Sequence, residues 1–249
     1  MIQASSALVV QDFVKVDNLL QNEYPASQRS DLTFGIETLD NALHLDFGQF
    51  IAFRGKTANF MCTLLCVRAM LPYPLGPDCD VLFVDGGNTF DPYAISDSSV
   101  TQNLDTEYVL DRFHVSRAFT PHQLACIIAD KLPDAIRKFK AKFVVVSDIT
   151  YLYCDPDVRD DDKEDAVRIF AKTVQALRVF ARQHHCLIIA TSLDLRNSLM
   201  DRILERAAHV SLNIEQREGF TKISSLKHQN LPPYTIIFSP HIQTLERFM

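Results

Sequence analysis

The chain has 249 residues, of which 47% are hydrophobic and 22% charged, the balance of a soluble globular protein with room for one large α/β domain. Its formal net charge of −6 argues against general nucleic-acid binding, which needs Lys and Arg to neutralise phosphates, although a local basic patch stays open. There is no leader pattern and no apolar run of membrane-spanning length, so we expect a cytoplasmic protein that does not enter a membrane.

The first 30 residues predict an N-terminal helical extension, separate from a core domain over residues 31–249. Apolar residues recur at helical spacing between positions 5 and 24, from Leu8 and Val9 to Leu19 and Leu20. Pro25 to Ser30 form a polar break. The apolar face of this helix either packs on its own core or docks on another subunit.

The core domain alternates apolar strands with helices. Strands are expected at 49–54, 81–84, 113–115, 142–146 and 186–190, and helices at 61–71, from Pro121 towards Lys131 and at 164–184. Because the strands are almost continuously apolar, they predict a mainly parallel sheet with helices on both faces. Shorter strands at 210–214, 221–226 and 235–238 predict a C-terminal antiparallel extension, and the fold class is therefore α/β.

Six cysteines are scattered along the chain without a Cys-x-x-Cys pair. We expect reduced thiols, with Cys62 and Cys66 buried on the helix after the first strand. No further ligands stand near them in the sequence, so no metal site is expected.

Three segments together resemble the RecA/RadA recombinase superfamily. They are the approach Phe34 to Asp40 with its following strand, the strand and loop from Val81 to Phe90, and the helix–strand pair that ends at Thr191-Ser192. The resemblance covers roughly residues 33 to 240 and implies a RecA-like core, a site for ATP and magnesium, and work in DNA recombination or repair.

The phosphate-binding loop of that superfamily is degenerate in this chain. Such a loop reads Gly-x-x-x-x-Gly-Lys-Ser/Thr, in which the Lys reaches the phosphates and the hydroxyl binds Mg²⁺. Aligned from Gly55, the second glycine is Phe60, the lysine is Met61 and the hydroxyl is Cys62.

An alternative phosphate loop starts at the same glycine. Gly55, Lys56 and Thr57 spell the right triplet, but the residues before Gly55 are expected to be strand, so no loop precedes the lysine. The interpretations left open are a shortened working loop at Lys56 and Thr57 and a simple turn.

Two acidic positions depart from the superfamily as well. The resemblance implies a catalytic Glu two residues after the strand-ending Asp85, where this chain has Gly87, so Asp85 to Asn88 are interpreted as a turn. It also implies a magnesium-binding Asp at the end of the 142–146 strand. Here the acid is Asp148, one residue late, and we keep open whether it still reaches a metal.

Contact with DNA or with a partner protein is assigned to two basic groups. One is Arg137, Lys138, Lys140 and Lys142, and the other is Arg196, Arg202 and Arg206. The first DNA-contact loop implied by the resemblance is here a dense acidic segment, residues 155–165, which repels phosphate.

The sequence therefore predicts a non-catalytic RecA/RadA-like paralogue, an accessory or scaffold protein in recombination or repair with no cofactor beyond weak ATP and magnesium binding. Its expected partner is another RecA-like protein or a second copy, with DNA as a further possibility. Two alternatives stay open: a nucleotide-binding ATPase or switch that uses Lys56 and Thr57, and a RecA-fold subunit unrelated to DNA.

Overall fold

The computed structural model describes residues 32–154, 160–193, 198–217, 219–228 and 232–238. The expected N-terminal helical extension, residues 1–30, lies outside this part of the chain, so the proposed division into extension and core stays a prediction.

The described residues form one mixed sheet in the order β3-β2-β4-β5-β1-β6-β7-β8. Strands β1 to β6 run parallel, and β7 and β8 add to β6 in antiparallel fashion. Their bounds are Phe50–Arg54, Val81–Asp85, Phe113–Arg117, Phe143–Ser147, Leu187–Ser192, Val210–Arg217, Phe220–Lys227 and Thr235–Phe238. The sequence-based fold class is thereby confirmed, with β6 belonging to the parallel part.

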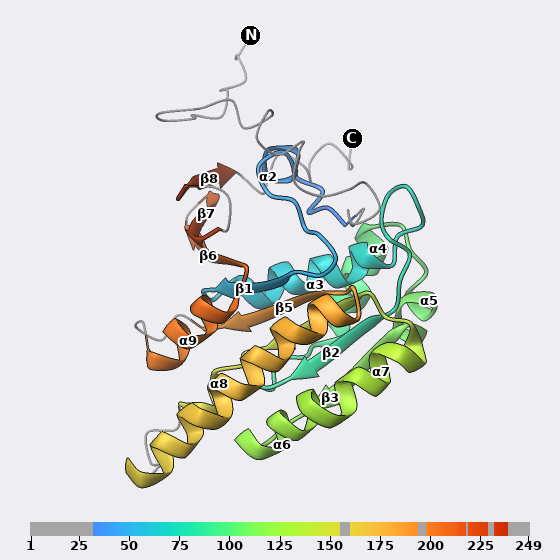
Figure 1. Cartoon of the computed structure of the whole chain (residues 1–249). Helices are drawn as coiled ribbons and strands as arrows, with labels where there is room; N and C mark the ends of the chain where they lie inside the picture. The colour runs from blue at the N-terminus through green and yellow to red at the C-terminus, as the bar shows by residue number, and fades with distance from the viewer. Residues whose placement is uncertain (1–31, 155–159, 194–197, 218, 229–231, 239–249) are drawn as a thin grey trace.

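Helices cover both faces of the parallel strands (Figure 1). On one face lie α2 to α5, and on the other α6 to α9. Their bounds are α2 Glu37–Asp40, α3 Ala58–Ala69, α4 Pro92–Thr101, α5 Thr106–Asp111, α6 Pro121–Cys126, α7 Leu132–Phe139, α8 Asp160–Gln183 and α9 Leu199–Ala207. The helices on the second face connect β3 to β4, β4 to β5 and β5 to β6 in turn.

Strand residues alternate between two hydrophobic clusters because successive side chains of a strand point to opposite faces. In β1, Ile51 and Phe53 pack with α3, whereas Phe50 and Ala52 pack with the α6–α9 layer. All five residues of β1, β2 and β4 are buried, as expected for parallel strands covered on both sides.

The expected helix from Pro121 continues well past Lys131. Thr120 caps it by accepting a hydrogen bond from the Gln123 N–H, and Pro121 occupies the first turn. Residues Ile127–Lys131 form a π-helical stretch before α7. Pro133, which has no N–H to donate, explains this irregular turn, since the helical ladder must rearrange around it.

The Phe34-to-Asp40 approach is held by two polar side chains. The Asp40 carboxylate accepts the N–H groups of Phe34 and Ile36, at 2.6 and 3.0 Å. From α3, the Arg68 guanidinium donates to the Thr33 carbonyl at 2.6 Å and to its hydroxyl at 2.7 Å. These bonds fix the segment on the α3 face of the sheet.

A buried histidine joins β1 to the start of β6. The His209 N–H donates to the Phe50 carbonyl at 2.7 Å, and the Phe50 N–H donates to His209 Nδ1 at 2.9 Å. Nδ1 can accept only in the neutral tautomer with the proton on Nε2. Burial, and then the positive charges of Arg178 and Arg182, lower the pKa of His209 to about 4.

Stability should therefore fall in acid because of His209. The imidazole of His209 binds a proton near pH 6.5 in the unfolded chain and only near pH 4 in the folded protein. The stability that neutral His209 contributes is therefore complete above pH 6.5 and is lost as the pH falls towards 4. The variant His209→Asn keeps an acceptor for the Phe50 N–H. Between pH 7.5 and pH 5, we expect its free energy of unfolding, measured in urea, to fall by about 1–2 kcal/mol less than that of the wild type. Equal losses in the two proteins would rule out this role.

Candidate functional site

The candidate site lies where β1, β2, β4 and β5 end, which we call the carboxyl edge of the sheet. Parallel neighbours end on the same side, and ligands of open α/β folds bind there. The segments that meet at this edge are residues 55–59 after β1, 86–89 after β2, Asp148 after β4 and the end of β5. Of the expected nucleotide site, these segments contain Gly55, Lys56, Thr57, Gly87 and Asp148. Asp85 is the last residue of β2, and Phe60, Met61 and Cys62 belong to α3.

The Gly55-Lys56-Thr57 segment is a tight turn against β6. Gly55 has φ of +107°, and a Cβ on it would stand 2.2 Å from the Ile214 carbonyl oxygen, so only glycine fits. The Thr57 hydroxyl donates to that same carbonyl at 3.1 Å. Lys56 is exposed. β1 runs up to Arg54 and α3 begins at Ala58, so the turn between them is made of Gly55, Lys56 and Thr57 alone.

A ring of hydrogen bonds closes the site just beyond that turn. The Asn59 amide nitrogen donates to Asp148 Oδ2 at 3.0 Å. The Asn59 amide oxygen accepts from the Thr191 hydroxyl, whose oxygen in turn accepts the Asp148 N–H at 2.8 Å. Asn59, Asp148 and Thr191 thus tie the start of α3 to the ends of β4 and β5.

Asp148 reaches this ring in spite of its late position. Its φ of +43° is left-handed and turns the side chain towards α3, which absorbs the one-residue slip. It is only 2% exposed. Burial, and then the nearby Asp85 charge, raise the pKa of Asp148, while the Asn59 hydrogen bond lowers it. The carboxylate is held by an amide in this structure, whereas a magnesium-binding Asp faces a hydrated ion.

Asp85 is fully occupied by structural contacts. Its carboxylate pairs with Arg117 at 2.9 Å, accepts the Ser147 hydroxyl at 3.1 Å, and accepts the N–H groups of Thr89 and Phe90. These bonds shape the bend from Gly86 to Asn88, where Asn88 has φ of +55°. The segment expected to be a turn is thus a bend that the Asp85 carboxylate holds.

Gly87 leaves no space for the glutamate that the resemblance implies. A Cβ on Gly87 would stand 2.4 Å from Asp148 Cβ and 2.7 Å from its Oδ2. Asp148 therefore fills the volume beside the Gly86–Asn88 bend. A glutamate at position 87 and an Asp148 side chain in this position could not both fit.

The remaining positions of the expected phosphate loop belong to α3. The helix begins three residues before the predicted start of 61, so Phe60, Met61 and Cys62 are helical. Met61 and Cys62 are buried, and Phe60 projects into solvent with 69% exposure. Burial, and then the Asp148 charge, raise the pKa of the Cys62 thiol, so this group remains a neutral part of the core.

The two basic groups are not brought together. Arg137 pairs with Asp134, the Lys138 ammonium lies 4.8 Å from the Phe139 ring centroid, and Lys140 ends α7. Arg202 and Arg206 are exposed on α9, on the far side of α8 from α7 (Figure 1). Arg196 lies outside the described residues, and Lys142 is half-buried at the start of β4.

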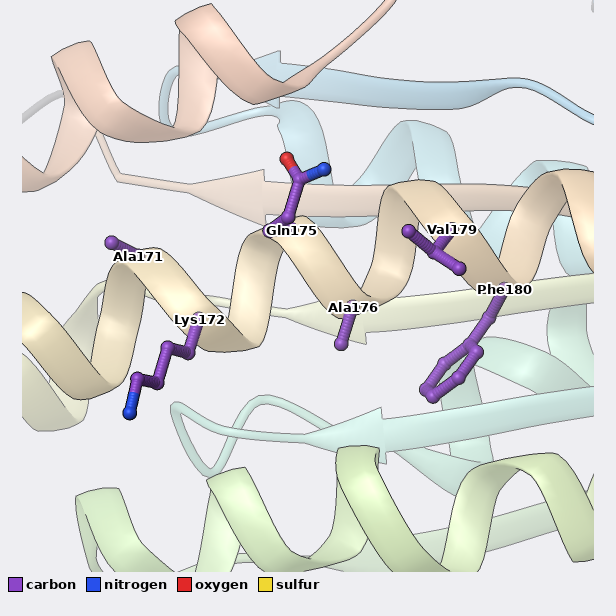
Figure 2. Close-up of a pocket in the computed structure, with 6 residues that line it drawn as sticks. All are labelled: Ala171, Lys172, Gln175, Ala176, Val179 and Phe180. Atoms are coloured by element: carbon purple, nitrogen blue, oxygen red, sulfur yellow. The ribbon is translucent and has the colours of Figure 1, made fainter.

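A shallow, open depression on the outer face of α8 is shown in Figure 2. Its lining comes from α8 alone, namely Ala171, Lys172, Gln175, Ala176, Val179 and Phe180. It offers almost no polar surface and lies apart from the residues of the candidate site.

Two further observations concern metal ions and membranes. Among the residues that the structure describes, no three His, Cys, Asp or Glu side chains are arranged to hold a metal ion. Within the same residues, no helix has both the length and the apolar character that crossing a bilayer needs.

The sheet order, the two helical layers and the position of the site define a RecA-like α/β core. The family model described as Rad51 matches residues 28–205, which contain β1 to β5 and every candidate site residue except Arg206. The chain belongs to the Rad51 family, and so to the RecA/RadA recombinase superfamily.

One relative is the human "Meiotic recombination protein DMC1/LIM15 homolog" from Homo sapiens. It is 33% identical to this chain over 210 residues, which are 77% of this chain and 59% of the relative. The chain thus spans well under two thirds of that protein.

Sequence reasoning missed the residues that close the site. Asn59 stood inside the degenerate loop and was passed over, and Arg117 is far from Asp85 in the sequence. The motif leaves the position of Asn59 unrestricted, so the only signal was a side chain able both to donate and to accept a hydrogen bond.

The Asn59–Asp148 contact predicts a charge-dependent stability change. Asn59→Asp would set a second carboxylate against a buried one and should destabilise the protein by about 2 kcal/mol. The double variant Asn59→Asp/Asp148→Asn restores a donor–acceptor pair and should recover most of that loss. Urea unfolding at neutral pH measures both variants, and additive losses in the double variant would contradict the contact.

Proposed function

We propose that this Rad51-family protein does not hydrolyse ATP and acts as an accessory or scaffold protein in DNA recombination or repair. The observation that carries the proposal is the ring through Asn59, Asp148 and Thr191, which engages Oδ2 of the carboxylate that a nucleotide-bound magnesium ion needs and leaves its Oδ1 buried without a hydrogen-bond partner among the described residues. The process is taken from the family and from the printed name of the human relative.

Three chemical requirements of phosphoryl transfer support the absence of turnover. The reaction depends on a cation against the developing charge, on a held metal ion and on a positioned water. In this chain Met61 stands in place of the lysine, Cys62 in place of the hydroxyl and Gly87 in place of the glutamate. Removing one such electrostatic group typically costs about 3–4 kcal/mol of barrier, so losing all three leaves no useful rate.

The alternative of a working loop at Lys56 and Thr57 has less support. The Thr57 hydroxyl is engaged with Ile214, and Lys56 points to solvent while an amide contacts Asp148. That alternative requires the Lys56 ammonium to enter a pocket beside Asp148, where the phosphates would lie.

A partner protein is favoured over DNA as the main contact. Within the described residues the basic side chains stand on separate helices, and Arg137 is paired with an acid. Phosphate neutralisation needs several free cations along one face. A RecA-fold subunit unrelated to DNA therefore remains the second candidate, and we retain the expectation of a cytoplasmic protein.

Calorimetry with Mg²⁺ and ATP tests the proposed function. We expect no binding heat with protein at about 100 μM, and no phosphate release with or without single-stranded DNA. Lys56→Ala serves as the matched control and should leave both results unchanged. Micromolar ATP binding that disappears in Lys56→Ala would overturn the proposal and establish the alternative loop.

A further inference from the structure

Helix α4, Pro92–Thr101, carries apolar side chains on two opposite sides. Ile95 is buried in the hydrophobic cluster that also contains α3, whereas Tyr93 and Val100 are 80% and 66% exposed. Tyr93 and Val100 are seven residues apart, almost two full helical turns, so their side chains leave the same side of the helix. We call this side the outer face of α4. A helix that is apolar on both sides is normally covered on both.

The composition of α4 also indicates a covered helix. Its ten residues contain one charge, Asp97, although the solvent side of a surface helix is normally rich in charge. Serine, threonine, β-branched and aromatic residues, which are weak helix formers, make up most of the others. Two nearby acids serve as helix caps, Asp91 for α4 itself and Asp105 for α5. Helix α4 therefore depends on packing for its stability.

The chain enters the described part of the molecule beside the end of α4. The Arg68 guanidinium of α3 donates to the Thr33 carbonyl at 2.6 Å and to the Gln102 side-chain oxygen at 3.1 Å. Gln102 is the C-cap of α4, so one side chain holds the start of the described chain close to the end of this helix. Leu32, which precedes Thr33, is buried in the same hydrophobic cluster as Ile95.

The residues before Leu32 contain a segment suited to the outer face of α4. Within the predicted N-terminal helix of residues 5–24, one apolar stripe repeats at spacings of four, three and four residues, namely Val9, Phe13, Val16 and Leu20. Residues 25–31 join this helix to Leu32 and span at most roughly 25 Å when extended. A helix of ten residues is about 15 Å long, so the stripe can reach the whole outer face of α4.

We propose that residues 5–24 pack as a helix on the outer face of α4 of the same chain. The stripe covers Tyr93 and Val100, and α4 in turn covers the stripe. A connection of seven residues favours the chain's own α4 over that of a second copy, because a short tether keeps the local concentration of the segment high. The packing is independent of the proposed function, since the outer face of α4 contains no residue of the candidate site.

Hydrogen exchange of the full chain, measured by mass spectrometry, tests this packing. We expect the amides of residues 9–20 to exchange at least about tenfold more slowly than those of an unfolded chain, equally at about 1 μM and about 100 μM protein. Phe13→Asp and Val100→Glu should each remove this protection. Phe13→Asp should also speed exchange in α4, because each helix covers the other. Both substitutions lie outside the hydrophobic clusters, and circular dichroism checks that the core stays folded.

Val179→Glu is the matched control. Val179 is 37% exposed on α8, on the other face of the sheet, so this variant should keep the protection of the wild type. Residues 9–20 that exchange at the rate of an unfolded chain overturn the proposal, and so does protection that survives Val100→Glu. Loss of protection in Val179→Glu would place the segment on the depression of Figure 2, and protection only at the higher concentration would place it on a second copy. Either result contradicts packing on the chain's own α4.

Discussion

The hydrogen bond from the Asn59 amide to the Asp148 carboxylate joins the start of α3 to the end of β4. Thr191 bonds to both residues and so connects β5 to them. In a nucleotide-binding P-loop protein, these elements hold the phosphates and a metal ion. Here side chains of the protein bond to one another at this point, although Asp148 Oδ1 has no hydrogen-bond partner within the described residues. Two glycines allow the close packing around it: Gly87 leaves room for Asp148, and Gly55 lets the turn pack on Ile214.

Hydrophobic packing and polar contacts both hold the RecA-like core together. Two hydrophobic clusters, one on each face of the sheet, supply most of the cohesion. Polar side chains join neighbouring elements. Asp85 and Arg117 join β2 to β3, and His209 joins β6 to β1. The Lys227 ammonium donates to carbonyl groups at the end of α9. Side-chain contacts of the chain itself thus hold the scaffold together.

Much of the fold could be predicted from the sequence, because buried parallel strands leave continuous apolar runs such as Val81 to Val84 and Phe143 to Val146. The start of α3 was placed too late, since Asn59 and Phe60 carry no helical signal of their own. Helices α4, α5 and α9 were not predicted, because short helices depend on caps such as Asp91, Asp105 and Ser198. The ring at the site was out of reach, because it joins side chains that are 89 and 132 residues apart.

A crystal structure of the protein grown with magnesium and a non-hydrolysable ATP analogue tests the closure of the site most directly. Our account predicts that the Asn59 amide remains hydrogen-bonded to Asp148 and that no triphosphate lies over the first turn of α3. The result that would contradict it is Asn59 turned away from Asp148, with the triphosphate on the start of the helix and a metal ion on the freed carboxylate.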